Sequence, residues 1–183
     1  TGFYHRINIE RDSMNINWEA QRYTSDFSFV HQYGNSVIGL IDSPAGSRVL
    51  DLGCGEFVFE MGGYGNNRLI HSALADTFAE HGYPYTMPFC FPTIGKYASL
   101  LETAGFKVTY AVLFDSPTKL DGEDGLKDWI TMFVKTPFSV VRDEYEMNEI
   151  LDQTVERLRE DLFIDGSWYS DYVRLRMKAV RAE

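Results

Sequence analysis

Cysteines and closely spaced metal ligands are scarce in this sequence. Its two cysteines, Cys54 and Cys90, lie far apart and form no C-x-x-C pair. This usage is typical of a reduced, cytoplasmic protein and argues against a disulfide-stabilised scaffold or a structural zinc site. The four histidines show no paired ligand spacing either, so the sequence predicts no protein-bound metal.

Positive charge and long hydrophobic runs are also lacking. The chain has 17 lysines and arginines against 27 aspartates and glutamates, which gives a formal net charge of −10. Such a chain is a poor partner for nucleic acid or for an anionic membrane surface, so we expect a small-molecule partner. No window approaches 18 apolar residues and no signal-peptide pattern opens the chain. We therefore expect a soluble, cytoplasmic protein.

The apolar content is sufficient for one packed domain. Apolar residues make up 44% of the 183 residues, and aromatic residues make up 15%. The chain begins at Thr1 and shows no clear periodicity over residues 1–13, which we interpret as an added or disordered leader. Residues 14–183 are expected to form a single domain, with a helical insertion at about 115–165.

The hydrophobic periodicity predicts alternating helices and strands after residue 14. Thr93 is placed to cap a helix at its start, and Gly82 and Gly105 are placed to end helices. Residues 115–125 are rich in turn-forming residues. The expected helices are 29–41, 69–78, 94–104, 126–133 and about 143–163, and the expected strands are 48–52, 57–61, 106–112 and 173–179.

The last of these strands has the clearest pattern. Four apolar residues from Val173 to Ala179 alternate with Arg174, Arg176 and Lys178. An apolar face opposite a basic face is typical of a half-exposed strand in an antiparallel pair. A different segment, Tyr83–Pro92, is irregular and aromatic, and it fits either a loop packed over the core or the wall of a binding pocket.

Two strand-like runs, each ending in glycines, lie close together near the middle of the chain. Val49–Leu52 ends at Gly53 and Gly55, and Phe57–Met61 ends at Gly62 and Gly63. Continuous apolar runs of this kind indicate buried parallel strands. Parallel neighbours need a crossover of a dozen or more residues, yet only Glu56 separates the first glycine turn from the second run. Either the two strands are not neighbours or a segment is absent between them.

A glycine turn after a strand is typical of a site for a nucleotide-like ligand, although a lone glycine pair also fits an ordinary tight turn. The dinucleotide pattern G-x-G-x-x-G fails here because Val58 occupies the position of the third glycine. No G-K-S or G-K-T triplet is present, so the phosphate-binding P-loop is also excluded.

The exact string at residues 49–55, V-L-D-L-G-C-G, resembles the first motif of class I S-adenosylmethionine-dependent methyltransferases. Other stretches resemble a small-molecule branch similar to trans-aconitate methyltransferases. They are residues 27–34, 57–66, 91–106, 113–120, 124–133 and 168–176. The resemblance implies an α/β, Rossmann-like methyltransferase sheet that is incomplete in this sequence, with a C-terminal antiparallel strand and a helical lid insertion.

This resemblance also implies an activity, a cofactor and site residues. The activity is methyl transfer from S-adenosylmethionine to a small molecule such as a carboxylate, which needs no general base, and the sequence identifies no catalytic residue. The implied cofactor-binding residues are Tyr23, Asp51, Gly53, Cys54 and Gly55, and the implied acceptor-side residues are Tyr64, Trp129 and Phe133. Core packing is the alternative role for the last two.

The sequence departs from the family after Gly55. About 70 residues are absent there if each missing βα unit takes about 25–35 residues, and Ser116 stands where an arginine is common. Three interpretations remain open. The protein is a complete methyltransferase whose sequence here omits a segment, an inactive remnant that serves as a structural or interaction module, or an intertwined homo-oligomer in which a second copy supplies the missing sheet neighbours.

Overall fold

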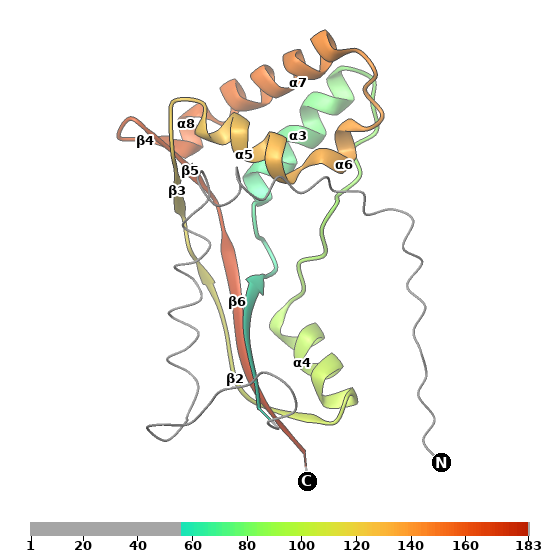
Figure 1. Cartoon of the computed structure of the whole chain (residues 1–183), viewed down its shortest axis with the longest axis vertical. Coiled ribbons are helices and arrows are strands. Elements are labelled where there is room, and N and C mark those ends of the chain that lie inside the picture. Colours follow the sequence, from blue (N-terminus) through green and yellow to red (C-terminus); the bar gives the residue numbers. More distant parts are fainter. Residues whose placement is uncertain (1–55, 183) are drawn as a thin grey trace.

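The structure is a computed structural model, and it describes residues 56–182 (Figure 1). These residues form a mixed α/β fold, as the sequence predicts. One part is a three-stranded sheet with helix α4 beside it, and the other is a helical lobe that includes a second, smaller three-stranded sheet. The elements are β1 (Glu56–Gly62), α3 (Arg68–Glu80), α4 (Ile94–Thr103), β2 (Phe106–Asp115), β3 (Thr118–Leu120), α5 (Gly125–Phe133), α6 (Lys135–Phe138), α7 (Glu144–Arg157), α8 (Arg159–Leu162), β4 (Phe163–Ile164), β5 (Ser167–Ser170) and β6 (Val173–Arg181).

Strand β6 is the centre of the larger sheet. It pairs antiparallel with β1 on one side and with β2 on the other, so that β1 and β2 run in the same direction. Its apolar residues Leu175, Met177 and Ala179 are fully buried, and they form a core with Leu101 of α4. The two antiparallel ladders confirm the predicted antiparallel C-terminal strand. Its apolar face is the one that packs against helix α4.

The basic face of β6 differs from the sequence-based expectation of a half-exposed strand. The side chains of Arg174 and Arg176 are only 16% and 18% exposed. Both reach Glu60 on the neighbouring strand β1, whose side chain is 2% exposed, at 3.1 Å and 2.6 Å. The arginines are largely withdrawn from water because the adjacent strand supplies a carboxylate. A buried pair of this kind is retained only where charge and hydrogen bonding are satisfied together.

Strand β1 also differs from the buried parallel strand expected for 57–61. The ladder that the structure gives it is antiparallel, to β6, and Phe57 is 37% exposed. The reason lies in its alternation. Phe57, Phe59 and Met61 are paired in register with the apolar residues of β6, whereas Glu60 is paired with Arg176. One face of β1 is apolar and the other carries charge, which is a two-sided strand pattern.

The helix boundaries follow the expected local signals. The Thr93 side chain accepts a hydrogen bond from the backbone N–H of Lys96 and so caps α4. Gly82 and Gly105 adopt φ angles of +78° and +87° just past α3 and α4. This left-handed conformation is the usual one for a glycine that ends a helix. The predicted caps are therefore confirmed.

Two local predictions are wrong in detail. The helix expected at about 143–163 is two helices, α7 and α8, that meet at Leu158. The chain then turns at Asp165 and Gly166, with φ angles of 49° and 74°, to form the β4–β5 hairpin. The turn-rich stretch 115–125 contains strand β3, which pairs antiparallel with β5. Helix periodicity could not reveal these strands, because they are only two to four residues long.

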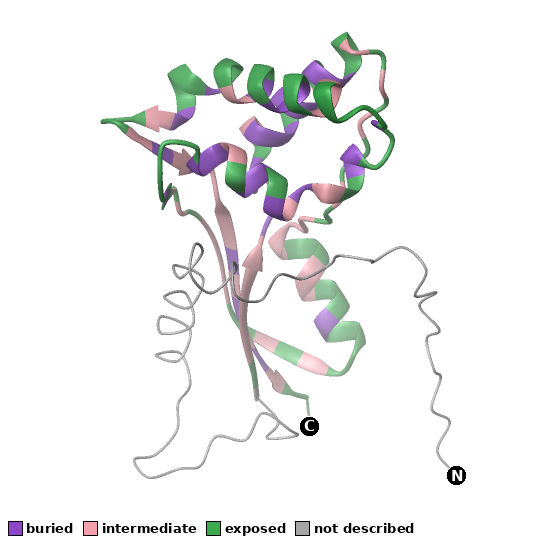
Figure 2. Cartoon of the chain, turned by 45° about the horizontal axis from the view of Figure 1, so that its top comes forward, coloured by how far each residue is buried: buried purple, intermediate pink, exposed green. Residues whose placement is uncertain are grey.

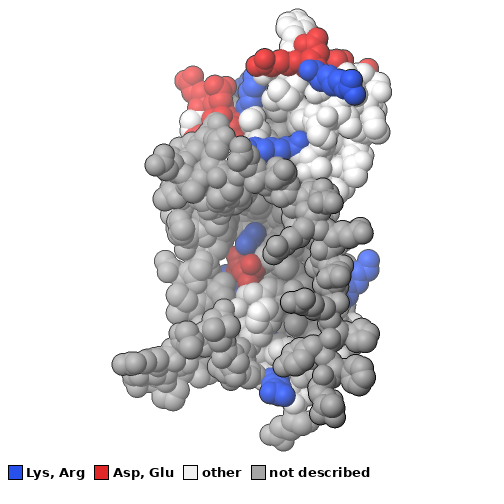
Figure 3. All heavy atoms as spheres, turned by 45° about the vertical axis from the view of Figure 1, so that its right-hand side comes forward, with Lys and Arg blue, Asp and Glu red and all other residues white. Residues whose placement is uncertain are grey.

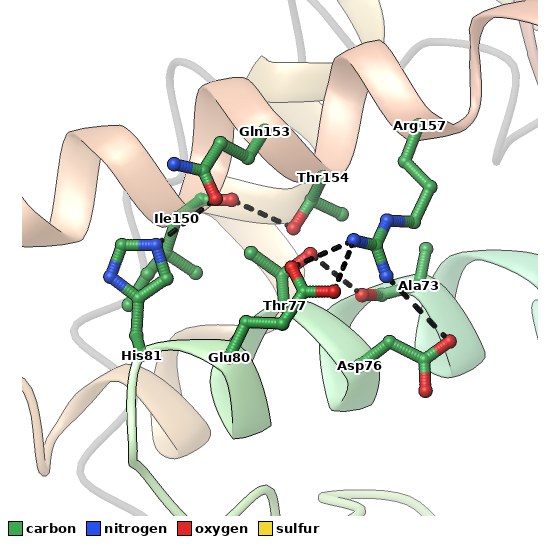
Figure 4. Close-up of polar contacts among 9 residues, drawn as sticks. All are labelled: Ala73, Asp76, Thr77, Glu80, His81, Ile150, Gln153, Thr154 and Arg157. Carbon is green, nitrogen blue, oxygen red and sulfur yellow. Dashed lines mark hydrogen bonds and ion pairs between the residues drawn. The ribbon is translucent and has the colours of Figure 1, made fainter.

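The helical lobe has its own core. Phe78, Leu126, Ile130 and Ile150 are fully buried in it. Figure 2 shows buried and exposed positions alternating along the helices of this lobe. Polar contacts join α3 to α7 at the edge of this core (Figure 4). There, Arg157 of α7 donates to both carboxylate oxygens of Glu80 on α3, at 2.7 and 2.8 Å. The lobe is thus held by an apolar interior with compensated charges outside.

Several charges on the outer surface of the helical lobe lie close to partners of opposite sign. Figure 3 shows acidic and basic side chains next to one another at the top of this view. Arg159, for example, donates to Glu156 one turn earlier, at 2.8 Å. Exposed pairs of this kind contribute about 0–1 kcal/mol each. Among the described residues, no helix is both long and apolar enough to span a membrane.

Candidate functional site

The site begins with the turn that follows β1. Gly63 donates its backbone N–H to the carbonyl of Val173 at 2.9 Å, and the Asn66 side chain accepts from the backbone N–H of Val173 at 2.8 Å. The Asn67 side chain accepts from the hydroxyl of Ser170, also at 2.8 Å. These bonds fix the residues between β1 and α3 against the start of β6. The turn is therefore held at the edge of the sheet.

Glycine is required in this turn by close packing. A Cβ atom on Gly62 would lie 2.7 Å from the ring of Phe91, and one on Gly63 would lie 2.9 Å from the Cβ of Leu175. Real Cβ atoms essentially never approach other atoms so closely. The turn lies against the sheet and the aromatic residue because the two glycines have no side chain.

Beside this turn is a cavity of about 720 Å³. It lies where β1 and β2 end and β6 begins, next to the first turn of α3. Its lining residues are Tyr64, Gly65, Arg68, Leu69, Leu113, Phe114, Asp115, Pro117, Asp171, Tyr172 and Val173. A cavity of about 300–1,000 Å³ is the usual size for a small-molecule site. Ligands of open α/β sheets bind at the carboxyl ends of the strands, which is the position found here.

Asp171 is the lining residue with the most unusual electrostatics. Its Oδ2 accepts from the backbone N–H of Leu69 in the first turn of α3, at 2.8 Å. Its Oδ1 is buried and has no hydrogen-bond partner. Burial raises the pKa of the Asp171 carboxyl, against the opposing influence of nearby backbone N–H groups and Arg68. The cavity wall thus contains a carboxylate with one unsatisfied oxygen.

The structure places the three predicted acceptor-side residues differently from one another. Tyr64 lines the cavity and is 65% exposed. Trp129 is 2% exposed in the core of the helical lobe, and Phe133 packs against the same core. Trp129 reaches the cavity only through Tyr172, a lining residue whose hydroxyl accepts from the indole N–H at 2.7 Å. Their assignment to an acceptor site stays a prediction.

The cofactor-side predictions fall elsewhere. Tyr23, Asp51, Gly53, Cys54 and Gly55 lie outside the described residues. Sequence reasoning also missed Arg68, Asp115, Asp171 and Tyr172, which line the cavity. Sequence reasoning could have identified them by their position, since each of them lies at or near the end of a predicted strand or helix. Within residues 56–182, no group of three or more His, Cys, Asp or Glu side chains is placed to hold a metal ion.

A buried histidine of α3 lies beside the aromatic residues of the segment Tyr83–Pro92. His71 of α3 is 6% exposed, and its Nδ1 is 2.6 Å from the hydroxyl of Tyr85. Its ring lies within 6.2 Å of Phe89 and Phe91, measured between ring centroids. Burial lowers the pKa of His71 to about 4 and raises the pKa of Tyr85. His71 is therefore neutral at pH 7.

The same contacts show how the irregular segment Tyr83–Pro92 is used. Tyr83 and Tyr85 pack against the core of the helical lobe. The carbonyl of Pro92 accepts from the backbone N–H of Tyr64 at 2.9 Å. The segment therefore links the helical lobe to the glycine turn, while the lining of the 720 Å³ cavity comes from other residues.

Comparison with known proteins adds one relative. No family model matches the chain. The chain is 28% identical over 132 residues to the Uncharacterized methyltransferase C70.08c of Schizosaccharomyces pombe. The similarity is to a methyltransferase. It covers 68% of this chain and 49% of the yeast protein, so the chain spans about half the length of the curated relative that it matches.

Proposed function

We propose that this protein transfers a methyl group from S-adenosylmethionine to a small molecule. The observation that carries the proposal is the cavity of about 720 Å³ at the carboxyl ends of β1 and β2. The similarity to a methyltransferase and the class I motif at residues 49–55 support it. The finer proposals rest on the sequence resemblance. They are a class I Rossmann-like sheet, a trans-aconitate methyltransferase-like branch, a carboxylate as one candidate acceptor and a cytoplasmic location.

S-Adenosylmethionine would supply an activated methyl group when bound. The chain's own task is then to hold the acceptor in line with that group and to keep water out. The cavity suits this task because its walls combine Leu69, Leu113 and Phe114 with the polar edges of Tyr64 and Tyr172. Apolar walls with a few fixed polar groups are typical of small-molecule sites.

One observation favours a second candidate, an inactive remnant that serves as a structural or interaction module. The cavity is at the carboxyl end of β1, whereas Gly55 is bonded to Glu56 at the amino end of that strand. Seven residues of strand at about 3.3 Å each separate the two ends by about 20 Å. The glycine motif could border the cavity only if a crossover segment were inserted between Gly55 and Glu56, so that the chain could return along the sheet. A longer protein would provide it, and an intertwined homo-oligomer would instead bring the motif from a second copy.

Calorimetric titration of S-adenosylmethionine into the full 183-residue chain tests the proposal. We expect saturable heat, and we expect the double substitution Asp51→Asn with Gly53→Val to abolish it. Gly95→Val is the matched control, because Gly95 is exposed on α4 and a Cβ there meets no atom within 4 Å. Absence of heat at millimolar ligand from a folded chain would favour the remnant if the intact mass of the natural protein is near the 21.0 kDa of these residues, because a larger mass would mean that a segment is missing from the chain tested. Size-exclusion chromatography of the same sample separates the monomer from the intertwined oligomer.

A further inference from the structure

The hydrogen bonds that the Asp171 carboxylate makes compensate its charge only in part, because burial raises the pKa of this carboxyl against the opposing effect of the backbone N–H groups beside it. One oxygen accepts from Leu69 and the other is buried without a partner. A buried charge costs free energy unless it is paired. The bond to Leu69 needs only an oxygen acceptor, and an asparagine side chain would supply that equally well. Capping α3 therefore does not explain why the residue carries a negative charge.

The remaining charges of the cavity also compensate it only in part, because Arg68 opposes the rise in the pKa of Asp171 but is itself exposed. Arg68 and Asp115 both line the cavity, but both are exposed and opposite in sign. Exposed charges are screened by water and contribute little. Asp171, which is only partly exposed, is therefore the lining charge that a bound ligand would feel most strongly. Its field favours a positive group inside the cavity.

The walls of the cavity are suited to such a group. Tyr64, Phe114 and Tyr172 contribute aromatic rings to the lining. Aromatic faces attract cations, and aromatic cages are the usual sites for organic ammonium groups. Two of these rings already have a cation of the chain beside them: the guanidinium carbon of Arg174 lies 5.8 Å from the ring centroid of Tyr172, and that of Arg176 lies 5.1 Å from the ring centroid of Phe114. A ligand cation would use the parts of these rings that the arginines leave uncovered.

We propose that this cavity recognises an organic cation, a small molecule with a primary ammonium group on an apolar body, through the negative charge of Asp171 and the surrounding aromatic rings. The inference rests on the proposed function in one respect, since this molecule would be the methyl acceptor. The ammonium is the group by which the acceptor is held. A carboxylate acceptor would instead place a second negative charge beside Asp171.

Three probes of similar size, each with a phenyl ring and a two-carbon chain, test the inference: 2-phenylethylamine, 2-phenylethanol and phenylacetate. Their binding to the full 183-residue chain is measured at pH 7.5 by ligand-observed NMR without S-adenosylmethionine. We expect the amine to bind about tenfold more tightly than phenylacetate, because it compensates a partly buried charge that phenylacetate opposes. The alcohol should fall between them.

Two variants with the same change in charge assign the effect to one residue. Asp171→Asn should remove the preference for the amine, whereas Asp121→Asn, at an exposed aspartate outside the lining of the cavity, should keep it within about twofold. Thermal unfolding shows whether each variant is folded. If Asp171→Asn does not fold, the three-probe comparison on the unaltered chain still decides.

Equal or tighter binding of phenylacetate, or no binding of any probe, would overturn the inference. An unchanged preference in folded Asp171→Asn would do the same. These failures are distinct from failure of the proposed function. Saturable heat from S-adenosylmethionine with no preference for the amine leaves methyl transfer standing, while amine binding without such heat leaves only the recognition of a cation.

Discussion

Replacing Gly63 by alanine tests whether the close approach of the glycine turn to the sheet maintains the cavity. The new Cβ would lie 2.9 Å from the Cβ of Leu175 and 3.2 Å from its backbone nitrogen, and it would overlap the side chain of Leu113. Leu113 lines the cavity, and Leu175 is fully buried on the central strand β6. Because one of the neighbours is backbone in the middle of the sheet, rotation of a side chain alone cannot relieve the contact.

Forcing an extra methyl group into a packed interior costs about 1–3 kcal/mol. We expect Gly63→Ala to lower the free energy of unfolding by about 2 kcal/mol, because both a side chain and the backbone must shift. For a chain of this length, that loss corresponds to a fall in Tm of about 4–8 °C. Urea unfolding followed by circular dichroism measures it, with an unchanged slope indicating that the unfolded state is unaffected.

Gly95→Ala is the matched control for this prediction. Gly95 is exposed near the start of α4, and a Cβ built on it meets no atom within 4 Å. Alanine should there stabilise the protein by about 0.5 kcal/mol through its higher helix propensity. A loss below about 0.5 kcal/mol for Gly63→Ala, within the range of an ordinary surface substitution, would refute the packing argument. Equal losses for both variants would refute it as well.

Two further predictions concern buried charge. The pKa of His71 is lowered by burial to about 4, below its unfolded value of 6.5, so the unfolded state binds its proton first as the pH falls. Stability from neutral His71 should be complete above pH 6.5 and decrease by about 2 kcal/mol between pH 7 and pH 5. His71→Gln should remove that part of the dependence in urea titrations. Glu60→Gln should lower the free energy of unfolding by about 3 kcal/mol, because it leaves two largely buried arginines without their carboxylate. The control Glu156→Gln, at an exposed glutamate, should lower it by less than about 1 kcal/mol. Similar losses for both variants would contradict this reasoning.

Local signals in the sequence predicted much of the fold. The caps at Thr93, Gly82 and Gly105 and the alternation along β6 depend on residues close together in the chain, and the structure agrees with them. Segments without such periodicity were missed. The three residues of β3 form a strand because β5 pairs with them, and that partner comes nearly 50 residues later. No pattern within residues 118–120 records it.

The basic face of β6 shows a second limit of sequence reasoning. Alternation identified which side chains share a face, and that assignment is correct. It did not identify what the face meets. Glu60 lies more than 100 residues earlier in the chain, and only the pairing of β1 with β6 brings it between Arg174 and Arg176. Burial of charged residues therefore depended on topology rather than on composition.

The lining of the cavity also depends on topology, which is why the sequence predicted only some of its residues. Its lining comes from three separate segments, after β1, at the end of β2 and before β6. Tyr64 was named from the family resemblance of residues 57–66, and the structure places it in the lining, while its acceptor-side role stays a prediction. Asp171 and Tyr172 lie in the family-like stretch 168–176, but no local pattern marks either of them as a site residue. They become cavity residues because antiparallel β6 must begin where β1 and β2 end, so that the residues just before β6 are carried to the carboxyl edge of its neighbours. A strand inserted antiparallel between two parallel strands thus supplies a side chain to the edge where ligands bind, and here that side chain is a carboxylate.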